Sequence, residues 1–125
     1  MKPGDHADVT RTFGVEDLKG YEKLSGHVVQ NQNIPEPLIG ALFSYLLGVK
    51  LPGVGTMYLK QETHFRHSVL IGEALTARVE ITRLRPDKQL ADLSTTCQDS
   101  AGRIIASGRA LVYTGDVNLN PVHND

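Results

Sequence analysis

The sequence has little cysteine, little imbalance of charge and no long hydrophobic run, and each deficit excludes a class of protein. The single cysteine, Cys97, has no second cysteine with which to form an internal disulfide, so we expect a reducing, cytoplasmic environment. The 13 basic and 14 acidic residues leave a net charge of −1, which predicts no basic surface for nucleic acid or an anionic membrane. The longest apolar run, residues 38–49, falls short of the ~20 residues that span a bilayer. The amino-terminal residues include no apolar segment, so no secretory signal is expected.

The residues that are present fit one small globular domain. Hydrophobic residues make up 40% of the chain and charged residues 22%, which excludes wholesale disorder and fibrous classes. A length of 125 residues leaves room for a single domain over residues 1–125. Residues 115–125 are polar and irregular and are predicted to form a loose tail.

Two helices are predicted in the first half of the chain. The run 38–49 is apolar on nearly every face at helical spacing, which is typical of a helix buried in the middle of a domain. Pro35 and Pro37 precede it, and Gly48 and Pro52 are placed to end it. A weaker helix is predicted over residues 15–25, with an apolar edge and Gly26 as its stop signal.

In the second half of the chain the hydrophobic period changes from that of a helix to two. Alternation over residues 57–66, 75–82, 91–98 and 104–112 predicts four strands, and residues 8–13 are a candidate fifth. The short turns between them favour antiparallel neighbours in a meander. The predicted fold is therefore α+β, with a curved antiparallel sheet wrapped around the long central helix. The outer face and free edge of such a sheet favour dimerisation.

Three segments resemble the MaoC-like (R)-specific enoyl-CoA hydratases, which have the hotdog fold. Leu46–Gln61 is similar to the helix end, loop and first strand of that family, Ser68–Ala77 to its V-x-x-G-D-x-L-T-A segment, and Arg103–Val112 to its final strand. The resemblance implies an enzyme that hydrates an enoyl thioester or dehydrates a 3-hydroxyacyl thioester, carried by CoA or an acyl-carrier protein. It also implies a homodimer or higher homo-oligomer. It implies no cofactor.

The chain departs from this family where the family carries its catalytic residues. The family places an Asp and a His, spaced D-x-N-P-x-H, on a long loop before the central helix, and this chain has a shorter loop with His27 at the Asp position. Glu36 stands where the family has a histidine at the start of the helix. Pro37 stands where the family has a glycine whose N–H polarises the thioester carbonyl, and proline has no N–H.

Glu36 and His27 are the candidate catalytic residues, as substitute acid and base groups. Each has an ordinary alternative: Glu36 complements a helix amino terminus, and His27 is an exposed loop side chain. The candidate substrate-binding residues are Leu38 and Ile39, through N–H groups for the thioester oxygen, and Gln32, as a hydrogen-bond partner of a water or of that oxygen. Gly53, Gly55 and Tyr58 are the candidates around the acyl group.

No metal site is expected in this sequence. His64 and His67, three residues apart on a strand, would point to opposite faces. Two other functions stay open: a hotdog thioesterase, and a non-catalytic acyl-thioester-binding or partner subunit that has lost the Asp and His.

Overall fold

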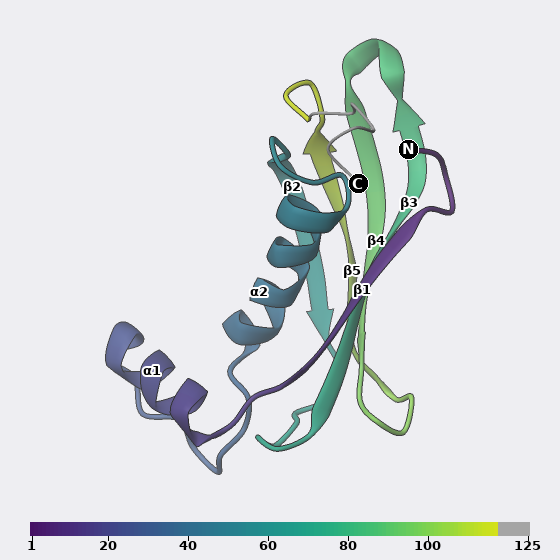
Figure 1. Ribbon diagram of the computed structural model, residues 1–125. Coiled ribbons are helices and arrows are strands. Elements are labelled where there is room, and N and C mark those ends of the chain that lie inside the picture. Colours follow the sequence, from purple (N-terminus) through teal and green to yellow (C-terminus); the bar gives the residue numbers. More distant parts are fainter. Residues whose placement is uncertain (118–125) are drawn as a thin grey trace.

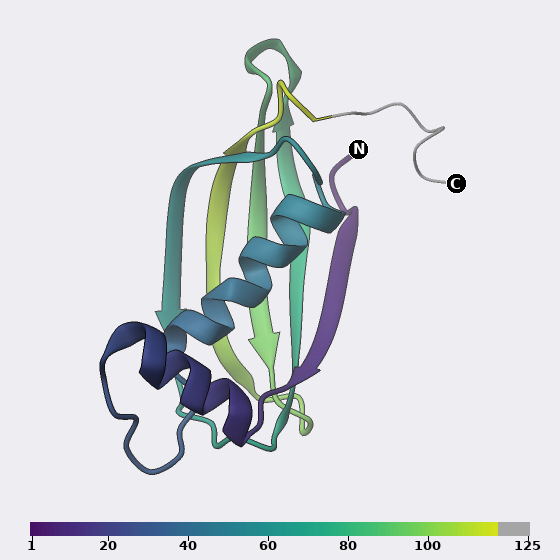
Figure 2. The ribbon, with the colours of Figure 1, turned by 60° about the vertical axis from the view of Figure 1, so that its left-hand side comes forward.

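The computed structural model describes residues 1–117, and the carboxy-terminal part of the predicted tail, residues 118–125, lies outside the described residues. One long helix lies across the concave face of a five-stranded antiparallel sheet, which confirms the predicted α+β arrangement (Figures 1 and 2). The elements are β1 (His6–Thr12), α1 (Val15–Ser25), α2 (Glu36–Tyr45), a π-helical turn (Leu46–Lys50), β2 (Met57–Phe65), β3 (Ala74–Arg85), β4 (Leu90–Gln98) and β5 (Ile104–Tyr113). Within residues 1–117, neither helix is long and apolar enough to cross a membrane.

The core forms where α2 meets the sheet. Phe43, Leu46 and Leu47 of the helical segment are almost completely buried, and burial stabilises each by about 1.5–3 kcal/mol. The sheet contributes small buried side chains to the same core cluster, and these are Ala77, Ala91, Ala106 and Ala110. The side of α2 away from the sheet is less covered, since Tyr45 and Val49 are exposed. The prediction that the helix is buried on every face is therefore wrong.

The central helix begins and ends differently from the sequence prediction. It starts at Glu36, within the proline pair, because Pro35 and Pro37 are compatible with the N-cap and first turn. Gly48 does not end it. The helix continues as a π turn to Lys50, in which the Leu51 N–H donates to the Leu46 carbonyl at 2.8 Å. Burial of Leu46 and Leu47 outweighs the roughly 1 kcal/mol that a glycine costs inside a helix.

The first helix, α1, ends where Gly26 predicts. Gly26 has φ 75°, and its N–H donates to the Glu22 carbonyl at 2.9 Å. At the other end, Asp17 accepts a hydrogen bond from the Gly14 N–H at 2.8 Å. Only Leu18 of this helix is buried, and Leu24 is 91% exposed, so the predicted apolar edge is mostly uncovered.

The strand order is β1-β3-β4-β5-β2, which corrects the predicted meander. The β3–β4 and β4–β5 hairpins are adjacent as expected. However, β2 pairs with β5 at the far edge, and the candidate fifth strand, β1, takes the place beside β3. The connection from β2 to β3, residues 66–73, consequently crosses beneath the sheet end where α2 begins (Figure 2).

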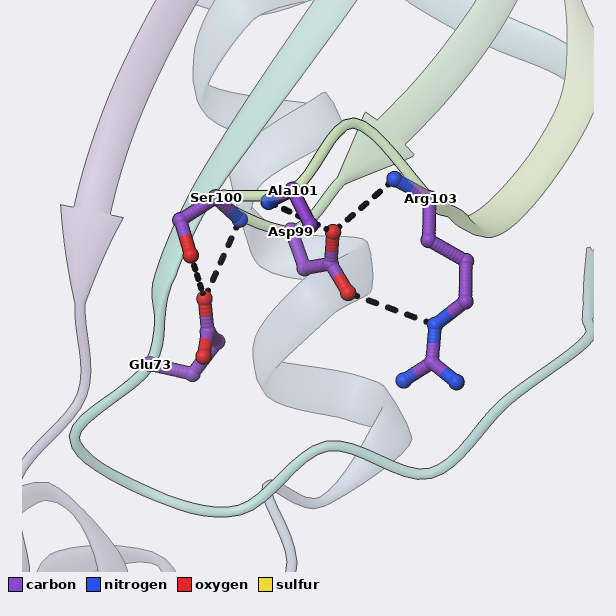
Figure 3. A network of polar contacts seen from close by, with 5 residues as sticks. All are labelled: Glu73, Asp99, Ser100, Ala101 and Arg103. Carbon is purple, nitrogen blue, oxygen red and sulfur yellow. Dashed lines mark hydrogen bonds and ion pairs between the residues drawn. The ribbon is translucent and has the colours of Figure 1, made fainter.

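A polar network anchors that connection to the β4–β5 turn. Glu73 accepts a hydrogen bond from the Ser100 N–H at 3.0 Å and another from the Ser100 hydroxyl, while Asp99 accepts from the N–H groups of Ala101 and Arg103 (Figure 3). These hydrogen bonds lower the pKa values of Glu73 and Asp99. The connection between β2 and β3 is thus held to the β4–β5 turn at its last residue, Glu73.

Candidate active site

Glu36 lies at the rim of a small pocket at the amino end of α2. It is the first residue of the helix, and its side chain is exposed. The pocket has a volume of about 150 Å³ and is lined by Ile34, Glu36, Ile39, Phe65, Arg66, His67, Ser68 and Val69. Two chain segments therefore form it: the start of α2 and the residues that follow β2.

Backbone hydrogen bonds hold these two segments together. The Ile34 N–H donates to the Val69 carbonyl at 2.7 Å, and the Ile71 N–H donates to the Gln32 carbonyl at 3.0 Å. Asn33 and Leu70 form an isolated antiparallel bridge between these bonds. The walls of the pocket are therefore held by main-chain pairing and not by side chains alone.

The predicted oxyanion donors have different positions in the structure. The Leu38 N–H is not free, because it donates to the Pro35 carbonyl at 3.0 Å, and this corrects its assignment as a free donor. Ile39 is 2% exposed and its side chain forms a wall of the pocket. Pro37 is exposed beside Glu36.

His27 and Gln32 belong to the short loop between α1 and α2. The His27 side chain is exposed, its N–H donates to the Ser25 Oγ at 3.1 Å, and it lies outside the residues that line the pocket. The Val29 N–H donates to the Glu22 carboxylate at 2.7 Å, which ties the loop to α1. Gln32 adopts φ 57° and contributes its carbonyl to the pairing described above, with its side chain exposed.

Gly53, Gly55 and Tyr58 lie at the opposite end of α2 from Glu36. Both glycines belong to the loop that follows the π turn, and Tyr58 is the second residue of β2 (Figure 2). The Tyr58 hydroxyl lies 3.5 Å from the Ser44 Oγ, and partial burial raises its pKa. Within this one chain these residues do not converge on Glu36, because the helical segment 36–50 is about 20 Å long.

Three polar pocket residues are absent from the sequence-based set: Arg66, His67 and Ser68. The strand prediction carried the alternation of β2 to residue 66, but the strand ends at Phe65, so His67 lies in the connection. The Arg66 N–H donates to the Ile105 carbonyl at 2.8 Å, and its Nε donates to the Ser107 Oγ at 3.1 Å. The one local signal was the end of the apolar alternation, and it does not reveal that this segment meets α2.

Other polar clusters offer less to a ligand. A hollow of about 200 Å³ lies on the outer face of the sheet, but Arg85 and Asp92 there already form an ion pair at 3.0 Å. Among residues 1–117, no group of three or more His, Cys, Asp or Glu side chains is placed to hold a metal ion. Cys97 is completely buried, and burial raises the pKa of its thiol to about 11.

Known structures identify the architecture as the hotdog fold. The (R)-hydratase of Aeromonas caviae superposes on 90% of this chain and 96% of its own, with a TM-score of 0.84 and 31% identity. A hypothetical thioesterase from Streptococcus pneumoniae shares the fold at 16% identity, with a TM-score of 0.68 over 90% of this chain and 80% of its own.

Sequence relatives narrow the class further. No family profile matches the chain. The (R)-specific enoyl-CoA hydratase of A. caviae is 44% identical over 93% of this chain and 92% of its own length. The enzyme of the same description from Rhodospirillum rubrum is 32% identical over 90% of this chain and 87% of its own. This chain belongs to the (R)-specific enoyl-CoA hydratase family.

The alignment with the A. caviae protein also contains a gap. The alignment is 130 positions long, which is more than the 125 residues of this chain. The relative therefore has internal residues without a counterpart in this chain.

Proposed function

We propose that the protein adds water reversibly to a trans-2-enoyl thioester, giving an (R)-3-hydroxyacyl thioester on CoA or an acyl-carrier protein. The observation that carries the proposal is the similarity to an (R)-specific enoyl-CoA hydratase along almost the whole chain. In the reaction a base takes one proton from water, the water oxygen bonds to the β-carbon, and the α-carbon takes up a proton. No group leaves and no redox state changes, so the proposal includes no cofactor.

Glu36 is the proposed base, because it is the carboxylate of the pocket at the amino end of α2. Its position in the first turn also exposes a bound thioester to the positive end of the helix dipole. His27 remains a candidate for the second acid–base group through its place on the shortened loop, although it lies outside the pocket. The buried Ile39 and the carbonyl-bonded Gln32 are proposed to shape the thioester end of the site.

The direct test is turnover of crotonyl-CoA by the purified protein. We expect loss of the enoyl-thioester absorbance, an (R)-3-hydroxybutyryl product on chiral analysis, and a much lower rate for Glu36→Gln. Release of free thiol without hydration would show a thioesterase instead. Binding of acyl-CoA without turnover would show a non-catalytic subunit, an alternative that Pro37 and the shortened loop specifically favour.

We also propose that the protein is a homodimer. Its outer sheet face is polar, with side chains such as Arg78 and Arg109. One group of exposed apolar residues instead follows α2 and the free edge of the sheet, and its members are Tyr45, Val49, Val54, Met57 and Leu59.

In the proposed dimer, two copies of this surface are related by a twofold axis perpendicular to α2, so the two α2 helices are antiparallel. The loop with Gly53 and Gly55, and Tyr58, would then lie toward the Glu36 end of the other copy, where they are proposed to contact the acyl group. We expect a dimer mass by light scattering and a monomer for Val49→Glu. The control is Leu24→Glu, which replaces an exposed leucine on α1 and should leave the mass unchanged. A monomeric wild-type protein would contradict the proposal. We also propose a reducing, cytoplasmic location for the protein, a proposal supported by its single cysteine.

A further inference from the structure

The connection after β2 brings a histidine to the pocket that Glu36 lines. His67 and Ser68 stand between two fixed points of the main chain. On one side the Arg66 N–H is bonded to the Ile105 carbonyl, and on the other the Val69 carbonyl is bonded to the Ile34 N–H. Because both ends of this short segment are fixed, the structure holds His67 at the pocket without help from its own side chain.

The imidazole of His67 is available for chemistry. It is exposed, and within residues 1–117 its side chain has no hydrogen-bond or ion-pair partner. Arg66, the adjacent cation, donates from its Nε to the Ser107 Oγ at 3.1 Å. His64, by contrast, is already bonded to Glu62 at 2.9 Å on the outer side of β2. His67 is thus a histidine that shares the pocket with the carboxylate and is not committed to another contact.

We infer that Glu36 and His67 together form the acid–base pair of this pocket, in place of the Asp and His on the loop that this chain has shortened. The inference rests on the proposed function. Glu36 takes a proton from water as the water oxygen bonds to the β-carbon, and the electron pair of the double bond moves into the thioester as an enolate. The protonated imidazole of His67 then gives its proton to the α-carbon, and proton transfer between the two groups through solvent restores the starting state. Ser68 is within the same wall and can orient the water.

The two residues of the proposed pair come from other segments of the chain than the Asp and His that the family carries on its loop. A carboxylate from the helix and an imidazole from the β2–β3 connection line the same pocket because Ile34 and Val69 are paired, so neither group needs the long loop. The reaction requires one group of each kind within reach of the same enoyl unit, and both groups line a single pocket of about 150 Å³.

The test uses single variants of the full chain with crotonyl-CoA. We expect His67→Ala to lower kcat by about 10²–10⁴-fold with little change in KM, which is the range for loss of a general acid. Added imidazole should restore part of the rate, an effect that a purely structural role would not give. His64→Ala is the matched control, since it removes a nearby histidine of β2 that does not line the pocket, and its rate should equal that of the wild type. Far-UV circular dichroism and the thermal midpoint should be unchanged in both variants.

The outcomes separate this inference from the proposed function. If the wild type hydrates crotonyl-CoA and His67→Ala keeps its full rate, the pair is wrong while the hydratase assignment stands. If His27→Ala loses the rate and His67→Ala does not, the acid is His27. If the wild-type protein turns over no enoyl or 3-hydroxyacyl thioester, both the function and the pair are overturned.

Discussion

The close approach of β5 to β2 at Gly108 gives a prediction whose size can be worked from the structure. Gly108 is paired with Thr63 of β2. A Cβ on residue 108 would overlap the Glu62 carbonyl oxygen and lie 2.8 Å from its carbonyl carbon and 2.9 Å from the Thr63 Cα. These are backbone atoms, so no side-chain rotation relieves the overlap, and the two strands must separate.

The expected effect of Gly108→Ala combines two terms of opposite sign. Overpacking of a rigid site costs about 1–3 kcal/mol. Replacing glycine by alanine restricts the unfolded chain and returns about 0.4–1 kcal/mol. The free energy of unfolding should therefore fall by about 1–2 kcal/mol, which lowers the thermal midpoint by roughly 4–8 °C for a domain of this size. Because β2 leads into Arg66 and His67, turnover of crotonyl-CoA should fall as well.

Differential scanning calorimetry checks the prediction, with Gly20→Ala as the matched control. Gly20 lies inside α1 with no heavy atom within 4 Å of an added Cβ, so the same substitution should raise the free energy of unfolding by about 0.5–1 kcal/mol. The two variants change the unfolded chain alike and differ only in the folded state. A Gly108→Ala protein that unfolds at or above the wild-type temperature would refute the reasoning.

Three further predictions concern other parts of the molecule. Since the Cys97 thiol is buried and its pKa is raised to about 11, a thiol reagent at mildly alkaline pH should label the protein only after denaturation, and rapid labelling of the native protein would contradict this. The hydrogen bonds from Ser100 lower the pKa of Glu73, so their stabilising effect is present above the unfolded-state pKa and is lost as pH falls through the folded-state value. Urea unfolding across this pH range should show a weaker pH dependence for Glu73→Gln, and identical curves would disprove the contribution. Pro37→Ala adds an N–H to the first turn of α2 and should speed crotonyl-CoA hydration, by at most the ~10²–10³-fold of a full oxyanion donor, whereas an unchanged rate would show that the thioester oxygen is held elsewhere.

Local chemistry explains which parts of the fold could be predicted from the sequence. The end of α1 follows from Gly26, whose left-handed conformation stops the helix, and the β3–β4 and β4–β5 hairpins follow from short turns between alternating runs. The position of β2 does not follow from local pattern, because the choice between β3 and β5 as its neighbour is made by the whole sheet. A bulge between Tyr58 and Lys60 also shifts the phase of β2, so that Tyr58 packs on the core while Met57 and Leu59 stay exposed.

In the candidate site, too, local pattern predicts one residue and long-range pairing determines another. Glu36 was singled out because it stands where the resembled family has a histidine at the start of the central helix, a start that the two prolines mark. His67 was missed because its relation to Glu36 depends on pairing between Ile34 and Val69, residues that are far apart in the chain. Sequence patterns predict a site residue when one helix or strand determines its position. They do not predict a site residue whose position depends on the pairing of two distant segments.

The short loop between α1 and α2 is a suitable place to insert longer loops from related proteins. Its two ends are anchored independently, at Gly26 and Val29 on α1 and at Gln32 on the segment after β2, and the residues between them take no part in the core. Each doubling of loop length costs only about 0.6 kcal/mol in closure entropy, so an inserted stretch would leave the sheet and the central helix unchanged. Catalytic loops from longer relatives can therefore be exchanged on one constant scaffold, and their contribution measured against the residues already in the pocket.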